Sequence, residues 1–331
     1  MKPFVDLSYG GQIKRLKQLA KQALPDYSLE AAKLTTLAHT ENTTFKVITL
    51  NNSYVLRVYR HNKHSIAEIE SELIWLTSLL YDTNIIVPRP IPNKQNSLFT
   101  IATAPGILEP RYCVLFPWLP GRFVRTKFTN KTIKQVGEFL AKLHNYSQKF
   151  FAPPGFERPM WDEDGLLGSF PINLPMESEA LLPAERKVLN SAALQIRKDL
   201  AKLDKNERSF GLIHGDLHFG NCKFHRSKIQ VLDFDDCAWG YYLYDLAITL
   251  YYLRRLENFN ALRTSFLAGY QTRRSLPQQY EFYLEAMIAA RRLELMRSLF
   301  ERQDNPKLKA IIPQFVDSTI EQMNQFLKTS N

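Results

Sequence analysis

The chain has 331 residues, of which 45% are hydrophobic and 23% are charged. These ordinary globular proportions exclude a disordered, a collagen-like and a coiled-coil protein. At a typical domain length of about 150 residues, the chain has room for two domains or one large bilobal unit. Lys and Arg outnumber Asp and Glu by 43 to 33, a net charge of +10, but the basic residues are scattered in pairs rather than in runs. We therefore expect no nucleic-acid partner.

Neither a membrane protein nor a secreted one is expected. No apolar run reaches the roughly 18 residues of a transmembrane helix, and the first residues lack the pattern of a signal peptide. The three cysteines, Cys113, Cys222 and Cys237, have no CxxC spacing. These features favour reduced thiols in a cytoplasmic protein.

The first third of the chain shows strand and helix patterns in turn. Apolar residues at helical spacing predict helices over residues 11–24 and 65–80. Alternating residues around Asn51-Asn52 predict a β-hairpin. The predicted strands are residues 43–50, 53–60, 97–103 and 111–116. We therefore expect a small antiparallel sheet with one key helix.

Two prolines and a glycine interrupt this pattern in Phe116-Pro-Trp118-Leu-Pro-Gly121. We interpret the segment as a hinge between an N-lobe, residues 1–116, and a C-lobe, residues 117–331. The C-lobe is predicted to be mainly helical, with a Pro-rich surface loop over residues 153–175. Its predicted helices lie around residues 133–143, 243–254, 262–271, 280–302 and 311–327, with short strands at 211–213 and 229–233. The predicted fold class is α+β and bilobal.

A cluster of polar residues after position 210 is the most informative feature of the sequence. It comprises Gly211-Leu-Ile-His214-Gly-Asp216-Leu-His218-Phe-Gly-Asn221 and Val231-Leu-Asp233-Phe-Asp235-Asp236. Burying such groups costs several kcal/mol unless they are paired or bind a cation, so the cluster indicates a site.

The spacing within this cluster suggests phosphoryl transfer. In kinases an Asp accepts the hydroxyl proton, an Asn five positions later binds metal, and a downstream Asp holds Mg²⁺. Asp216, Asn221 and Asp233 have this arrangement. A metallohydrolase is the alternative, because His214, Asp216 and His218 alternate and on a strand would face one side as metal ligands.

Together with Tyr244-Asp245-Leu-Ala247, these motifs resemble the aminoglycoside phosphotransferase and choline kinase superfamily, which has a protein-kinase-like fold. The chain looks most similar to the group that holds bacterial stress-response Ser/Thr kinases and type-II homoserine kinases. Individually weak matches occur in the family's order at residues 54–60, 71–76, 115–121, 140–144 and 291–306.

The resemblance implies ATP and Mg²⁺ as cofactors, with ATP in a cleft between the lobes. Asp216 would be the catalytic base, and Asn221 and Asp233 would bind Mg²⁺. Glu72 would pair with a cation on the nucleotide-binding strand. That cation is Arg57, where the family usually has a lysine.

Four further residues are candidate site residues. Asp235 replaces the glycine of the protein-kinase Asp-Phe-Gly motif and is a candidate ligand of a second metal ion. Thr43 lies in the polar segment 39–45, which stands where a Gly-rich phosphate loop is usual, and is a candidate phosphate contact. Phe116 and Trp118 are candidates for stacking near adenine, although aromatic core packing explains them equally well.

We therefore expect an ATP- and Mg²⁺-dependent phosphotransferase with a hydroxyl acceptor. The acceptor is either a protein Ser or Thr or a small amino alcohol or homoserine-like molecule. From residue 240 onward, 12 basic residues face 9 acidic ones, which argues against a polycationic aminoglycoside. An aminoglycoside-type antibiotic kinase stays as an alternative, as does a non-catalytic nucleotide-binding regulator.

Overall fold

The structure is a computed structural model that describes residues 2–30, 33–124, 128–168, 181–302 and 306–329. It divides into two compact units. Unit 1 comprises the chain up to Arg122 together with residues 152–157 and 223–235, and unit 2 comprises the remainder.

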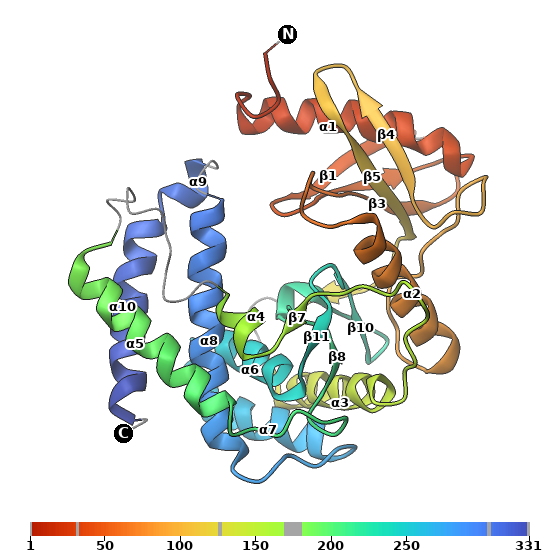
Figure 1. The fold of residues 1–331 in the computed structure, drawn as a ribbon. Helices are drawn as coiled ribbons and strands as arrows, with labels where there is room; N and C mark the ends of the chain where they lie inside the picture. Colours follow the sequence, from red (N-terminus) through yellow and green to blue (C-terminus); the bar gives the residue numbers. More distant parts are fainter. Residues whose placement is uncertain (1, 31–32, 125–127, 169–180, 303–305, 330–331) are drawn as a thin grey trace. The chain divides into compact units, whose positions relative to one another are not determined.

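Unit 1 is built around a five-stranded antiparallel sheet with the strand order β1-β2-β3-β5-β4 (Figure 1). Its strands are β1 (Lys33–His39), β2 (Thr43–Ile48), β3 (Ser53–Val58), β4 (Thr100–Ala104) and β5 (Ile107–Pro117). The four strands predicted from alternation are confirmed. The sequence reasoning missed β1, because Leu34 is its one buried residue and the strand has no regular apolar face.

Two helices complete this unit. The helix α1 (Tyr9–Ala23) lies along the sheet, and its buried residues Leu16 and Leu19 pack in one core with Phe45 and Leu56 of the strands (Figure 1). The helix α2 (Ile66–Asp82) begins at a capping box, in which Ser65 and Glu68 each accept the other's backbone N–H. Both helices were predicted from their apolar spacing.

Regular pairing stops within the predicted interruption, because β5 ends at Pro117 and residues 118–121 are irregular. The strand β5 continues through Phe116 to Pro117, which pairs with Tyr54. Proline lacks a backbone N–H, but the neighbouring Trp118 N donates to Ser53 O at 3.0 Å, so this end of β5 remains hydrogen-bonded to β3. The division between the two units falls after Arg122.

A second sheet, with the order β10-β9-β6, lies largely in unit 1. It consists of β6 (Arg122–Phe123), β9 (Cys222–His225) and β10 (Lys228–Val231). The strand predicted to reach Asp233 ends at Val231, so Asp233 lies on an irregular segment beyond it. The backbone of Asp233 is left-handed, with φ 63°, which is incompatible with a strand.

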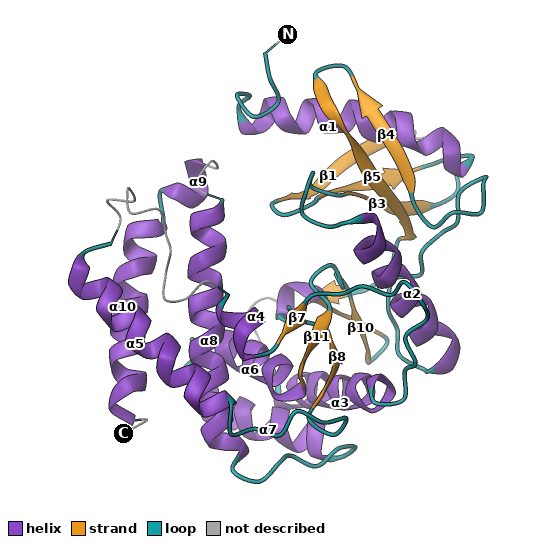
Figure 2. Ribbon diagram, viewed as in Figure 1, coloured by secondary structure: helices purple, strands orange, loops and turns teal. Residues whose placement is uncertain are grey.

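Unit 2 is mainly helical (Figure 2). Its helices are α3 (Asn130–Ser147), α4 (Glu163–Leu167), α5 (Pro183–Leu200), α6 (Tyr242–Leu253), α7 (Phe259–Gln271), α8 (Tyr280–Glu301), α9 (Pro306–Lys309) and α10 (Ile312–Thr329). A small sheet, with the order β7-β11-β8, contains β7 (Met160–Trp161), β8 (Phe210–Ile213) and β11 (Ala238–Tyr241). The predicted antiparallel sheet and the larger helical part, and with them the α+β class, are confirmed.

The Pro-rich stretch predicted to be a surface loop is only partly irregular. Within it, β7 pairs with β11, and α4 buries Leu166 and Leu167 completely or nearly so. These elements are too short to give a periodic pattern among the prolines. Residues 169–175 of the stretch lie outside the described residues. Throughout the part of the chain that the structure describes, no helix has the length and apolarity required to cross a membrane.

Candidate active site

The polar motif around Asp216 forms a loop that leaves strand β8 at Ile213 and ends in a 3₁₀ turn at Phe219–Asn221. His214, Asp216 and His218 therefore do not lie on a strand, and the alternation that suggested three metal ligands on one face does not apply. His214 is fully buried, and its Nδ1 accepts a hydrogen bond from Asp216 N at 3.2 Å. The imidazole of His214 thus helps to shape the loop.

Asp245, in the first turn of α6, anchors this loop from the interior. Its Oδ2 accepts the N–H of His214 at 2.7 Å, and its Oδ1 accepts the N–H of Gly215 at 2.8 Å. His144 of α3 contacts the same carboxylate at 3.1 Å, and burial lowers the pKa of His144 despite this contact. Two N–H groups and an imidazole thus satisfy a carboxylate that is wholly excluded from water.

Gly215 has a positive φ of 81°, and a Cβ there would lie 2.2 Å from the carbonyl oxygen of Asp236. No other residue fits this position without a backbone shift. The loop is therefore fixed both by the Asp245 carboxylate and by close backbone packing.

Asp216 projects from the fixed loop with 21% of its side chain exposed. Its Oδ1 accepts a hydrogen bond from Nη2 of Arg291 in α8, and its Oδ2 lies 3.4 Å from His218 Nε2. Burial alone would raise the pKa of Asp216, but Arg291 and His218 outweigh burial and lower the pKa to about 2. Asp216 is consequently ionised at neutral pH.

Asn221, at the end of the loop, is buried and points its amide nitrogen back at the loop. Nδ2 of Asn221 donates to the carbonyl oxygen of Asp216 at 3.0 Å. With the nitrogen so placed, Oδ1 is the amide atom left to accept a hydrogen bond or to bind a cation.

In unit 1, Arg57 of β3 connects three acidic residues. Its Nη1 donates to Glu72 Oε1 of α2 at 2.7 Å, and its Nη2 donates to Asp233 Oδ1 at 3.0 Å. Asp235 Oδ1 lies 3.9 Å from the same guanidinium group. Burial opposes the charge of Arg57, but Glu72 and the other anions hold the pKa of Arg57 well above its usual value. The structure thus forms the predicted pair between the strand cation and the helix glutamate.

Comparison with known proteins assigns the family. Residues 33–283 match the family described as "Phosphotransferase enzyme family". The chain belongs to this family. The phosphotransferase is 25% identical to amicoumacin kinase of Bacillus subtilis over 237 residues, which cover 71% of this chain and 67% of the relative. It is 28% identical to hydroxylysine kinase of Bos taurus over 177 residues, 48% of this chain and 45% of the relative.

Solved structures agree with this assignment. A microcompartment-associated aminopropanol kinase superposes with a TM-score of 0.82 at 28% identity, covering 95% of this chain and 98% of the other. A spectinomycin phosphotransferase shares the fold with a TM-score of 0.61 at 15% identity, covering 95% and 98%. The protein-kinase-like fold expected from the motifs is confirmed, and the phosphotransferase is an enzyme that phosphorylates a hydroxyl group.

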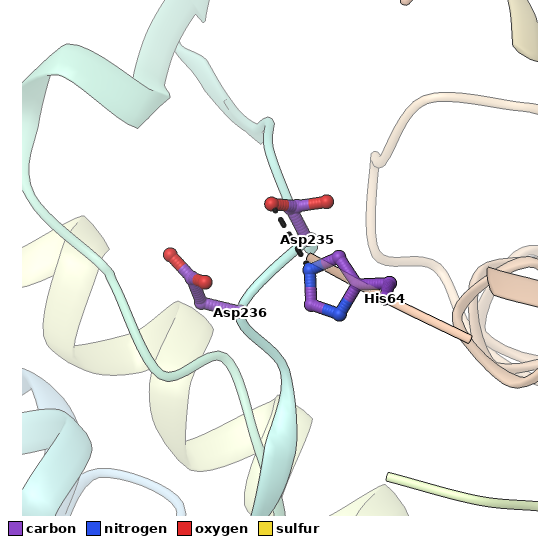
Figure 3. A group of neighbouring side chains, drawn as sticks. All are labelled: His64, Asp235 and Asp236. Atoms are coloured by element: carbon purple, nitrogen blue, oxygen red, sulfur yellow. Dashed lines mark ion pairs between the residues drawn. The ribbon is translucent and has the colours of Figure 1, made fainter. Parts of the chain in front are cut away.

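The two acidic residues beyond β10 of the phosphotransferase differ in their surroundings. The carboxylate of Asp233 is 52% exposed, whereas that of Asp235 is buried and lies 2.6 Å from Lys63 Nζ. Asp235 also pairs with His64 Nε2 at 3.4 Å, as Figure 3 shows. Burial would raise the pKa of Asp235, but Lys63 and His64 lower it far below the usual value. The sequence reasoning missed Lys63 and His64, because segment 60–64 has the composition of an exposed basic turn.

The remaining candidate residues of the phosphotransferase lie in unit 1. The hydroxyl of Thr43, the first residue of β2, is 2.7 Å from Nδ1 of His39, the last residue of β1. Phe116 is buried, with the guanidinium of Arg57 5.3 Å from its ring centre. The ring of Trp118 has the ammonium groups of Lys46 and Lys223 at 4.1 and 4.5 Å.

Arg291 is the clearest site residue that the sequence reasoning did not select. The sequence shows it as one half of the basic pair Arg291-Arg292, which begins a weak family match but otherwise looks like scattered charge. Both arginines are in fact buried. A pair of charges within a strongly apolar helix pattern is the signal that points to buried partners.

Proposed function

We propose that the chain transfers the γ-phosphate of ATP to a hydroxyl group of a small amine-bearing molecule, with Asp216 as the base. The observation that carries this proposal is the ionised carboxylate of Asp216, which projects from a loop immobilised by Asp245. A base must be unprotonated and held in place to accept a proton during the transfer.

In this mechanism the acceptor hydroxyl donates a hydrogen bond to Asp216. The acceptor oxygen forms a bond to the γ-phosphorus while the bond between that phosphorus and the β,γ-bridging oxygen breaks. The hydroxyl proton passes to Asp216, and ADP leaves with the electron pair of the broken bond. Asp216 then returns the proton to solvent.

The chemistry of the predicted ligands suits Mg²⁺ as a cofactor. Mg²⁺ prefers oxygen ligands and keeps several waters, so few protein ligands suffice. We assign the exposed carboxylate of Asp233 and Oδ1 of Asn221 as its ligands, and Asp235 as a candidate for a second ion. Bound Mg²⁺ would neutralise phosphate charge. Arg57 is assigned to the ATP phosphates, with Thr43 as a further phosphate contact and Phe116 and Trp118 as contacts near adenine.

The charges near Asp216 favour an acceptor that carries an ammonium group. Burial raises the pKa of Glu294, Arg291 opposes this effect, and Asp236 and Asp216 reinforce it. Arg297 also opposes it, so three carboxyl groups act here against two guanidinium groups, a balance that suits a cationic ligand. Three of the relatives are named for aminopropanol, hydroxylysine and amicoumacin. We therefore prefer a small amino alcohol to a protein Ser or Thr.

The test is a phosphorylation assay with γ-labelled ATP and Mg²⁺. The acceptor panel contains 1-amino-2-propanol, hydroxylysine, homoserine, an aminoglycoside, and 2-propanol as the matched compound without an amine. We expect turnover with amino alcohols and none with 2-propanol. Preference for the aminoglycoside would instead support the antibiotic-kinase alternative.

Asp216→Asn is the matched variant. It should lose at least about 100-fold in kcat, as loss of a general base does, while ATP still raises the melting temperature. Turnover retained by Asp216→Asn would exclude the proposed base. ATP-induced stabilisation of the unmodified chain without turnover on any acceptor would favour a nucleotide-binding regulator.

A further inference from the structure

Arg291 of α8 uses its guanidinium group to connect Asp216 with two other side chains. Nη2 donates to Asp216 Oδ1 and also to the hydroxyl of Tyr252, 3.2 Å away. Nη1 donates to Glu294 Oε2 at 2.8 Å. Only 5% of the Arg291 side chain is exposed, so the guanidinium group has little freedom to leave these partners.

These contacts make the two oxygens of Asp216 unequal. Oδ1 is occupied by a buried cation, whereas Oδ2 lies on the side of His218, whose ring is 31% exposed. A carboxylate rotates readily about its terminal torsion unless it is held. The contact with Arg291 removes that freedom.

We propose that Arg291 is a positioning residue for phosphoryl transfer, which holds Oδ1 of Asp216 so that Oδ2 is presented to the acceptor hydroxyl. This inference rests on the proposed role of Asp216 as the base. Glu294 and Tyr252 in turn fix the guanidinium group, so that the orientation of the base is set by α8 and α6 together.

The next residue in α8 provides a matched control. Arg292 is equally buried, but it donates to Thr319 Oγ1 at 2.8 Å and to the carbonyl oxygen of Phe315 at 2.9 Å, both in α10. It also donates to the hydroxyl of Tyr251 in α6 at 2.8 Å, so its contacts join α8 to α10 and α6, and none of them is with Asp216. Loss of Arg292 should lower stability without a specific effect on the chemical step.

The experiment compares Arg291→Met, Arg291→Lys and Arg292→Met in kcat, KM for ATP and melting temperature. Because misplacing a reacting group by about 1 Å can cost about 100-fold in rate, we expect Arg291→Met to lose about that factor in kcat with KM for ATP unchanged. Arg291→Lys retains the charge without the planar fork, and its kcat should be about tenfold higher than that of Arg291→Met. Arg292→Met should lower the melting temperature while kcat of the folded fraction stays near the unmodified value.

Equal kcat in Arg291→Met and the unmodified enzyme would overturn the inference, as would equal losses of kcat in Arg291→Met and Arg292→Met. If the Arg291 variants do not fold, Tyr252→Phe takes their place. It removes one hydrogen bond to Arg291 and should lower kcat several-fold without changing KM for ATP, and an unchanged kcat would contradict the proposal. Activity retained by Asp216→Asn would refute the base itself, which distinguishes that failure from one confined to Arg291.

Discussion

Arg57 in β3 and Asp233 beyond β10 are 176 residues apart in the sequence, yet Nη2 of Arg57 lies 3.0 Å from Oδ1 of Asp233. The other end of the same guanidinium group holds Glu72 of α2. The planar fork of arginine thus contacts two carboxylates at once, which the single ammonium group of lysine does with more difficulty. This geometry gives a physical reason for arginine at a position where the family usually has lysine.

The first prediction concerns this fork. Arg57→Met leaves Glu72 buried without its cation, and breaking such a pair typically lowers the free energy of unfolding by about 3–5 kcal/mol. Arg57→Lys keeps the charge and should lower it by about 1–2 kcal/mol through the loss of one charged hydrogen bond. Urea unfolding measures both values, and ATP titration of turnover should show a raised KM for Arg57→Lys.

Arg60 is the control for this comparison, because 41% of its side chain is exposed and its contact with Glu41 is 3.8 Å long. Arg60→Met should change the free energy of unfolding by less than about 1 kcal/mol, as for other surface ion pairs. Equal destabilisation by Arg57→Met and Arg60→Met would contradict the importance of the buried fork.

The sequence predicts a helix or strand of this fold where that element alone determines the spacing of its apolar residues. The alternation of β2 and the apolar stripe of α2 follow from the local periodicity of buried residues. The spacing of Asp216, Asn221 and Asp233 predicts phosphoryl transfer, because kinases have a base and metal ligands in that order. Strand β1 was missed because Leu34 is its one buried residue.

What the sequence does not show is which distant side chains meet. Arg291 is 75 residues from Asp216, and Lys63 is 172 residues from Asp235. No local sequence pattern predicts either contact, because the packing of α8 and the course of the segment before α2 determine which side chains meet. Charge counting also fails here, since it treats a buried guanidinium group and a solvated one alike.

The second prediction tests the close backbone packing of Gly215. Gly215→Ala combines a positive φ of 81° with a Cβ 2.2 Å from the carbonyl oxygen of Asp236. Gly155 has nearly the same φ, 79°, but nothing within 4 Å of the added Cβ. Gly155→Ala should therefore cost about 1 kcal/mol of strain. Gly215→Ala should cost clearly more and abolish turnover, because the loop that carries Asp216 must shift. Thermal unfolding and a turnover assay distinguish the two, and similar effects of both variants would show that φ alone matters.

The third prediction concerns pH. The pKa of Asp216 is about 2 in the folded chain, below the 3.8 of an unperturbed carboxyl group. A carboxyl group with a lowered folded-state pKa stabilises the fold above its unfolded pKa and loses that contribution as the pH falls through its folded pKa. The difference of nearly two pKa units corresponds to about 2 kcal/mol, present above about pH 4 and lost toward pH 2.

Asp216→Asn removes this titration and serves as the reference. The difference in free energy of unfolding between the unmodified chain and Asp216→Asn should be constant from pH 7 to about pH 4 and shrink toward pH 2. A difference that already shrinks between pH 7 and pH 5 would mean that Asp216 titrates near neutrality and that Arg291 does not stabilise its charge.

The fourth prediction concerns the anchor of the catalytic loop. In Asp245→Asn, one oxygen that accepts a backbone N–H becomes an NH₂ group, so two donors face each other in a site fully excluded from water. An unsatisfied buried donor costs about 1–3 kcal/mol, and the loss of the charge adds to this. Thr249→Val is the control, since it removes only the hydrogen bond from Oγ1 to Leu217 O, 2.9 Å long, and should cost about 1 kcal/mol. Hydrogen exchange of the His214 and Gly215 amides should accelerate strongly in Asp245→Asn and little in Thr249→Val.

Because Asp245 touches no residue assigned to ATP, its loss should lower kcat far more than it raises KM for ATP. Protected amides together with full turnover in Asp245→Asn would show that the loop keeps its shape without the carboxylate.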